Sequence, residues 1–135
     1  MTWSSSKPKT VLIADDRADV RLAVSRAFAD DYEFRVCGEA VDGQDAVDKA
    51  HELKPDLIIL DFSMPVMNGM EAARVLSDSL PAVTMILYTL HTGEYMEAQA
   101  RSAGFKALVS KSQDISLLVA QARHLLGLLA AHRPN

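Results

Sequence analysis

The chain alternates short apolar runs with longer stretches in which apolar residues recur every three or four positions. The short runs show no polar alternation, which is typical of strands covered on both faces, and the longer stretches have the spacing of amphipathic helices. The strongest run places four consecutive apolar residues between Asp56 and Asp61. The five predicted strands cover 10–14, 34–39, 56–61, 82–88 and 105–109. The five predicted helices cover 18–30, 42–53, 68–79, 93–102 and 115–130.

This alternation predicts an α/β fold, in which a five-stranded parallel sheet has helices on both faces. Right-handed crossovers restrict such a chain to a three-layer doubly wound topology. The 135 residues fit a single domain. We place this domain at 9–130, between a flexible N-terminal tail at 1–8 and a C-terminal tail at 131–135.

Composition and charge narrow the class of protein. The net charge of -4 argues against nucleic acid as a direct partner, because phosphate backbones select basic surfaces. The chain has neither the apolar core of a signal peptide nor a run long enough to span a bilayer, so we expect a soluble, cytoplasmic protein with no membrane partner. A single cysteine, Cys37, excludes an intrachain disulfide, and we expect it to be a buried, inert thiol.

Polar residues stand at the carboxyl ends of four predicted strands, where doubly wound sheets bind ligands. Asp15 and Asp16 follow the first strand, and Asp61 ends the third. Thr89 ends the fourth, and Lys111 follows the fifth. Two carboxylates about 5 Å apart repel each other by roughly 3 kcal/mol at an effective dielectric of 20, so such a cluster usually needs a cation. Oxygen ligands indicate Mg²⁺ rather than zinc, with Lys111 offsetting part of the remaining charge.

A carboxylate, a divalent cation, a lysine and a hydroxyl are the groups that phosphoryl transfer requires. Asp61 is the predicted nucleophile, because the acidic pair lies on one side of it and Thr89 and Lys111 on the other. Taken singly, each residue has an ordinary explanation: the acidic pair as a helix cap, Asp61 as a solvated loop residue, Lys111 as a surface lysine. Their convergence on one edge favours the functional interpretation.

With these residues in view, residues 9 to 128 resemble the receiver domain of two-component response regulators. The most specific motif places Met-Pro three and four residues after Asp61 and a glycine eight residues after it. A second stretch, 36–43, is similar to receivers of the nitrate-response type. The motifs that carry the resemblance are Leu12-Ile13-Ala14-Asp15-Asp16, the segment from Leu60 to Gly69, Tyr88-Thr89 and Val109-Ser110-Lys111.

The resemblance implies a role for each matching position. Asp61 would be the phosphorylation site, with a phosphohistidine of a sensor histidine kinase as donor. Mg²⁺ would be bound by Asp16, Asp61 and the backbone carbonyl of Ser63, and by Asp15 mainly through water. Thr89 and Lys111 would contact the phosphoryl oxygens. The implied fold is flavodoxin-like, with strand order 2-1-3-4-5, and the implied role is a signalling switch rather than an enzyme.

The sequence departs from the family pattern beside this set. Leu108 stands where an aromatic switch residue is usual, three positions before the lysine, and Leu90 replaces the small residue that usually follows the threonine. Ser112 replaces the proline that often follows the lysine, which excludes a cis-prolyl bond there. We expect Ser63 and His91 to border the site and to tune the lifetime of the phosphoryl group, while a solvated loop histidine is an equally good interpretation of His91.

Two other functions stay open. One is a pseudo-receiver that binds a partner without phosphorylation. The other is a phosphatase of the haloacid-dehalogenase type, although such enzymes use a second aspartate two residues after the nucleophile, and Ser63 stands there.

The last predicted helix also has two interpretations. Its apolar stripe fits a core contact, while Leu117 and Leu128 widen it enough to suggest a partner or homodimer surface. No DNA-binding segment follows it, so we expect no direct nucleic-acid contact by this chain, as a stand-alone receiver or as part of a longer regulator. The residues expected in the core stripe are Ile115, Leu118, Val119, Ala122, Leu125, Leu126 and Leu129.

Overall fold

The apolar runs form one five-stranded sheet, in which every neighbouring pair is parallel and the order is β2-β1-β3-β4-β5. The computed structural model describes residues 7–129, and the predicted α/β fold and strand order are confirmed. The strands are β1 (Lys9–Ala14), β2 (Phe34–Ala40), β3 (Leu57–Leu60), β4 (Thr84–Thr89) and β5 (Ala107–Ser110). The helices are α1 (Ala18–Ala29), α2 (Gly43–Leu53), α3 (Gly69–Ser79), α4 (Glu94–Ala103) and α5 (Ser116–Leu125).

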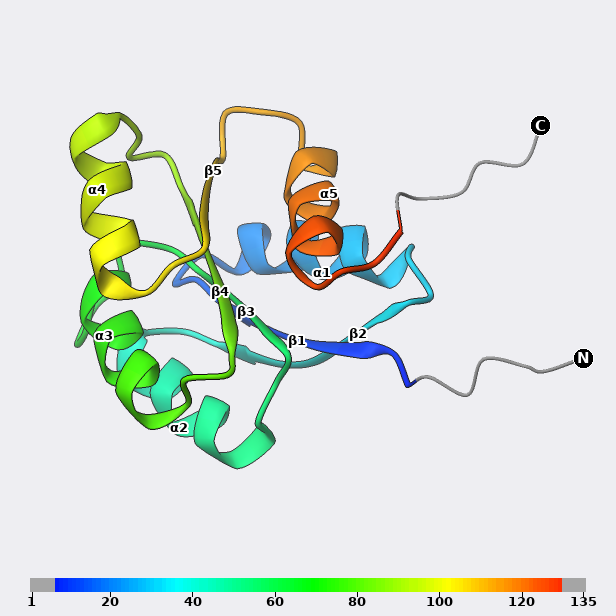
Figure 1. Ribbon diagram of the computed structural model, residues 1–135, viewed down its shortest axis with the longest axis horizontal. Helices are drawn as coiled ribbons and strands as arrows, with labels where there is room; N and C mark the ends of the chain where they lie inside the picture. Colours follow the sequence, from blue (N-terminus) through cyan, green and yellow to red (C-terminus); the bar gives the residue numbers. More distant parts are fainter. Residues whose placement is uncertain (1–6, 130–135) are drawn as a thin grey trace, which may run out of the picture.

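Helices cover both faces of the sheet, which explains why its central strands are uniformly apolar. Figure 1 shows α1 and α5 on one side and α2, α3 and α4 on the other. Alternate residues of each strand therefore enter two separate cores. In β1, Leu12 packs with α2 and α3, whereas Val11 and Ile13 pack with Val24 and Phe28 of α1. All four residues of β3 are buried.

The end of the last helix differs from the prediction of 115–130. Helix α5 ends at Leu125, because Gly127 adopts a left-handed conformation with φ 72°. The N–H of Leu128 donates to the carbonyl of Arg123 at 2.8 Å, and the N–H of Gly127 donates to that of His124 at 3.2 Å. These two bonds form a Schellman motif, which turns the chain away from the helix axis.

This turn exchanges the environments of two leucines. Leu129, expected in the core stripe, is 85% exposed, while Leu128, expected outside it, packs against the core. Residues 1–6 and 130–135 lie outside the described residues, so the predicted tails and the domain boundaries stay predictions. No helix within 7–129 is long and apolar enough to cross a membrane.

Candidate functional site at the carboxyl edge of the sheet

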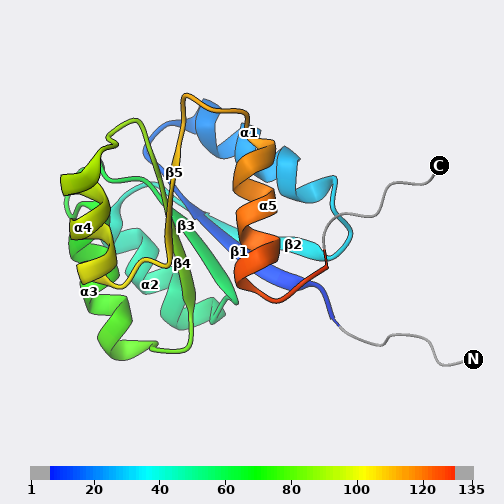
Figure 2. The same ribbon diagram turned by 45° about the horizontal axis from the view of Figure 1, so that its top comes forward.

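The loops that follow β1, β3, β4 and β5 gather at one end of the molecule, the upper end in Figure 2. Parallel strands deliver their carboxyl ends to the same edge, so residues distant in sequence become neighbours. Strand β3 pairs with β1 and β4, and β4 pairs with β5. Asp61 therefore lies at the centre of this edge.

Asp15, Asp16 and Asp61 lie together, as predicted. One carboxylate oxygen from each lies within 4.8 Å of the others. Asp15 and Asp61 are buried, whereas Asp16 is exposed. The cluster thus has two desolvated carboxylates and one that faces solvent.

Lys111 contacts both buried aspartates. Its Nζ lies 2.6 Å from Asp15 Oδ2 and 3.3 Å from Asp61 Oδ2, and only 11% of its side chain is exposed. Desolvation opposes the charge on Lys111, but the hydrogen bond that Lys111 donates to Asp15 and the attraction of Asp61 outweigh it and raise the pKa of Lys111. Lys111 is therefore an ammonium ion held between two carboxylates.

Burial raises the pKa of Asp61, and the repulsion of Asp15 acts in the same direction. Lys111 opposes this shift but does not cancel it. Lys111 therefore does not fully offset the cost of keeping a negative charge on Asp61. A further positive charge near Asp61 would stabilise its carboxylate.

The three carboxylates fit a hard divalent cation. They offer only oxygen ligands, converge within 4.8 Å, and bring more negative charge than Lys111 neutralises. Mg²⁺ prefers such ligands and usually retains water, which suits the exposed side at Asp16. The residues that would hold it are Asp15, Asp16 and Asp61, with the backbone carbonyl of Ser63 as the fourth predicted ligand.

The β3–α3 loop orients Asp61 through its backbone. The Oδ1 of Asp61 accepts from the N–H of Phe62 at 2.8 Å, and the N–H of Gly69 donates to the carbonyl of Phe62 at 2.9 Å. A Cβ on Gly69 would lie 2.1 Å from the carbonyl oxygen of Asp61, so only glycine allows α3 to begin this close to Asp61. Asn68 caps α3 through a reciprocal pair of hydrogen bonds with Glu71.

Thr89 is fully buried at the end of β4. Its Oγ1 accepts from the N–H of His91 at 3.2 Å, and its carbonyl accepts from the N–H of Lys111 at 2.9 Å. Within 7–129 the structure records no hydrogen bond between Thr89 and Asp61. Thr89 is thus adjacent to the site but contacts it through the β4–α4 and β5–α5 loops.

Ser63 and His91, both predicted to border the site, contact each other. The Oγ of Ser63 lies 3.1 Å from Nε2 of His91, and the imidazole packs edge-on against the ring of Phe62 at a centroid distance of 5.4 Å. These contacts join the loop after β3 to the loop after β4, beside Asp61.

Arg21 is a residue that sequence reasoning missed. From α1 it donates to the backbone carbonyl of Asp15 at 2.7 Å and pairs with Glu39 of β2 at 3.0 Å. It thereby holds the loop that carries the acidic pair.

Helix capping does not explain the acidic pair. The side chain of Asp15 accepts a hydrogen bond from the N–H of Arg17, but Arg17 is the N-cap of α1 and the helix has no side-chain cap.

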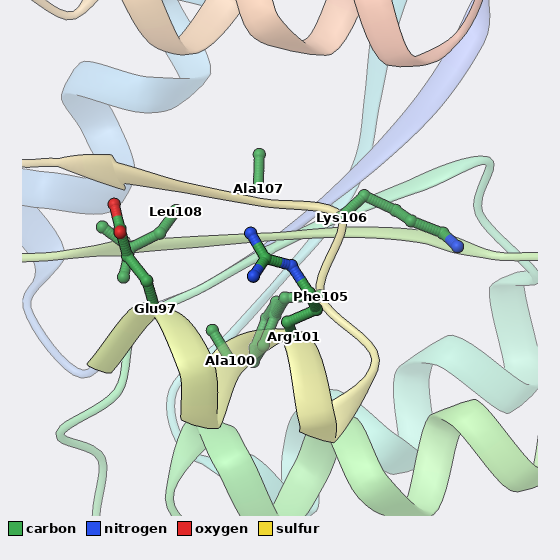
Figure 3. A pocket seen from close by; sticks show the side chains of 7 residues that line it. All are labelled: Glu97, Ala100, Arg101, Phe105, Lys106, Ala107 and Leu108. Carbon is green, nitrogen blue, oxygen red and sulfur yellow. The ribbon is translucent and has the colours of Figure 1, made fainter. Parts of the chain in front are cut away.

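Leu108 and Leu90 occupy different surroundings. Leu108 lines a small pocket between α4 and β5, where Figure 3 shows Glu97 and Arg101 of α4 turned toward the strand. Leu90 is 68% exposed, so its side chain is not buried in the site over Asp61.

Cys37, expected to be buried, is only half-buried, and its partial burial raises the pKa of the thiol.

Comparisons with known proteins agree with this arrangement. The model of the response regulator receiver domain family matches residues 11–123. The response regulator protein VraR of Staphylococcus saprophyticus is 34% identical over 109 residues, which cover 81% of this chain and 52% of that protein. The chain thus spans about half the length of the curated relatives it matches.

Two solved structures share the fold. The signal receiver domain of the response regulator NarL from Mycobacterium tuberculosis has a TM-score of 0.86 at 24% identity, covering 90% of this chain and 98% of that one. The CheX–CheY–BeF3–Mg²⁺ complex from Borrelia burgdorferi has a TM-score of 0.85 at 22% identity, covering 93% and 95%. The family model covers most of the chain and includes each of the four strand ends described above, so this chain belongs to the response regulator receiver domains of two-component systems.

Proposed function

We propose that the chain is a phosphorylation-dependent switch, in which Asp61 accepts a phosphoryl group from a phosphohistidine of a sensor histidine kinase. The observation that carries the proposal is the position of Asp61: a buried carboxylate, undercompensated in charge, with an ammonium ion 3.3 Å from Oδ2. A nucleophile of this kind needs positioning and charge neutralisation rather than an acid or base of its own.

In the proposed reaction, an Asp61 oxygen forms a P–O bond as the P–N bond of the phosphohistidine breaks. The imidazole leaves with the electron pair of that bond. The Phe62 N–H orients Oδ1, and Lys111 stabilises the negative charge on the transferring oxygens. A bound Mg²⁺, supported also by the magnesium complex of the Borrelia protein, would supply further charge stabilisation. We propose that Thr89 contacts a phosphoryl oxygen.

The pair of Ser63 and His91 belongs to the same proposal, as a control on the lifetime of the phosphoryl group. The pair joins two loops beside Asp61, where water must approach to hydrolyse the acyl phosphate. Removing it in Ser63→Ala or His91→Ala would change the rate of phosphoryl loss, measured by mass after the donor is removed. Equal lifetimes for both variants and the unmodified chain would exclude this part.

The test of the main proposal is incubation with a small phosphodonor and Mg²⁺, read by intact mass. We expect a gain of one phosphoryl group that disappears in Asp61→Ala and persists in Asp78→Ala, whose aspartate is exposed on α3. No gain, or a gain that survives Asp61→Ala, would refute the proposal. No gain would favour the pseudo-receiver alternative, and turnover of phosphomonoesters would favour the phosphatase.

A homodimer through the last helix remains a second part of the proposed function. Because α5 ends at Leu125 and Leu128 packs inward, the surplus apolar surface on α5 itself reduces to Leu117, which is 47% exposed. Leu22 on the neighbouring α1 is 50% exposed. Sedimentation with and without a phosphoryl mimic tests this surface, and a monomer under both conditions would exclude it. The cytoplasmic location and the absence of enzymatic turnover and of direct nucleic-acid contact stay predictions.

A further inference from the structure

An aromatic ring lies beside Lys111. Tyr88 is only 6% exposed, and its ring belongs to the core formed with α1 and α5. The Nζ of Lys111 lies over this ring, 6.0 Å from its centroid. The same ammonium contacts Asp15 and Asp61, so three partners surround one charge.

The backbone holds these two residues in a constant relation. In the parallel ladder Tyr88 pairs with Val109 of β5, two residues before Lys111. The N–H of Lys111 donates to the carbonyl of Thr89, which follows Tyr88. The strand pairing and this hydrogen bond therefore keep the backbone of Tyr88 close to the backbone of Lys111.

A lysine stem is flexible, and the two carboxylates hold its ammonium unequally, at 2.6 Å for Asp15 and 3.3 Å for Asp61. An aromatic face attracts a cation within about 6 Å of the ring centroid, and more strongly where water is excluded. Burial raises the pKa of Tyr88, so its ring stays a neutral phenol with this attraction intact.

We propose that Tyr88 is a positioning residue for phosphoryl transfer: the face of its ring holds the ammonium of Lys111 beside Asp61. This inference rests on the proposed function of Asp61. A purely structural explanation is that Tyr88 fills volume among aliphatic neighbours such as Ile86 and Val109, a role that any apolar side chain of similar size would serve.

Substitutions separate the two explanations. The rate of phosphorylation by a small phosphodonor with Mg²⁺ is measured by intact mass for Tyr88→Phe, which keeps the ring, and Tyr88→Leu, which removes it. We expect Tyr88→Phe to match the unmodified chain and Tyr88→Leu to react roughly three- to tenfold more slowly. Tyr32→Leu is the matched control, because Tyr32 is 88% exposed.

Fluorination of a phenylalanine at position 88 gives a stricter test, because it weakens the π face with little change of shape. Rates that fall stepwise from one fluorine to three would support the proposal. A flat series would overturn it even if Tyr88→Leu were slow, since packing alone would then explain the loss.

NMR spectroscopy of the full chain gives a test that does not depend on phosphorylation. The ε-methylene protons of Lys111 should show a ring-current shift that Tyr88→Phe retains and Tyr88→Leu loses. Equal shifts in all three proteins would overturn the proposal. If the shift is present but the unmodified chain gains no mass, the proposed function fails and the contact between ring and ammonium stands.

Discussion

The backbone of the β3–α3 loop is strained at Val66. This residue has φ 69°, in the left-handed region that β-branched residues rarely adopt, and its side chain is 81% exposed. Exposure means that packing does not compensate for the conformation. The loop runs from Asp61 to α3, so the strain lies within the segment that follows the proposed phosphoryl acceptor.

Replacing Val66 with asparagine should therefore stabilise the protein. Asparagine tolerates the left-handed region, and relief of the strain is expected to raise the free energy of unfolding by about 1 kcal/mol. Urea denaturation measures the change. The matched control is Val75→Asn, on an exposed position of α3 with helical backbone, where the similar helix propensities of valine and asparagine should give no gain. A gain at both positions would show that strain is not its source.

Cys37 provides a pH-dependent prediction. Partial burial raises the pKa of its thiol, so the folded chain holds the proton more tightly than the unfolded chain does. The stability from this group is complete below the pKa of an unfolded thiol, roughly 8.5, and is lost as the pH rises through the higher folded pKa. The rate of alkylation by iodoacetamide should rise at higher pH in the folded protein than in urea. Coincident profiles would contradict the burial of this thiol.

The charged residues of the site could be predicted from sequence because a strand end fixes where a residue lies. Asp15 and Asp61 follow apolar runs directly, Lys111 follows one after a single serine, and the sheet brings the three residues together. Arg21 and Tyr88 could not be predicted in the same way. Arg21 reaches the site from within a helix and Tyr88 from within a buried strand, so their contacts depend on helix docking and on strand register.

At the scale of elements, the uniformly apolar runs of the buried strands made the strands easy to predict. The repeated leucines after Leu125 led to a predicted last helix that is too long. Leucines continue at helical spacing beyond Leu125, and this pattern hid the significance of Gly127. A glycine just after a periodic segment is a helix stop signal, which could have located this end. Gly127 adopts the left-handed φ that the Schellman motif requires.

The segment after α5 is attached to the domain by Arg123. Only 7% of this side chain is exposed, and its guanidinium lies 2.7 Å from Asp31 and 2.7 Å from Glu33. Its Nε also donates to the carbonyl of Leu129 at 2.7 Å. One side chain thus connects α5, the α1–β2 loop and the returning chain.

Replacing Arg123 with methionine should destabilise the protein strongly. The substitution leaves two carboxylates together without their cation, and removal of one partner from a buried ion pair costs roughly 3–5 kcal/mol. Because Glu33 is partly exposed, we expect a value near the lower end, measured by urea denaturation. Arg26→Met is the control, since Arg26 is exposed on α1 and should change stability by no more than about 0.5 kcal/mol. Equal effects at the two positions would contradict the anchoring role.

For the whole molecule, the acidic cluster exists only when the fold is complete. Asp15 and Asp16 belong to the β1–α1 loop and Asp61 to the β3–α3 loop, and the pairing of β1 with β3 brings the loops together. The repulsion among these carboxylates is therefore a cost of the folded state. Any cation that binds the cluster binds the folded chain and not the unfolded one.

Mg²⁺ should therefore raise the stability of the whole protein. A ligand that binds only the folded state stabilises it by about 2.7 kcal/mol at a concentration one hundred times its dissociation constant. The denaturation midpoint should rise with the logarithm of the Mg²⁺ concentration above that constant, and this dependence should be lost in Asp16→Asn. Asp19→Asn should retain it, because Asp19 is exposed in the first turn of α1 and pairs with Arg17 rather than with the cluster. Only a site that needs the carboxylate of Asp16 can distinguish the two aspartates. A midpoint that rises equally in both variants would therefore mean that the ion acts by general screening of the net charge.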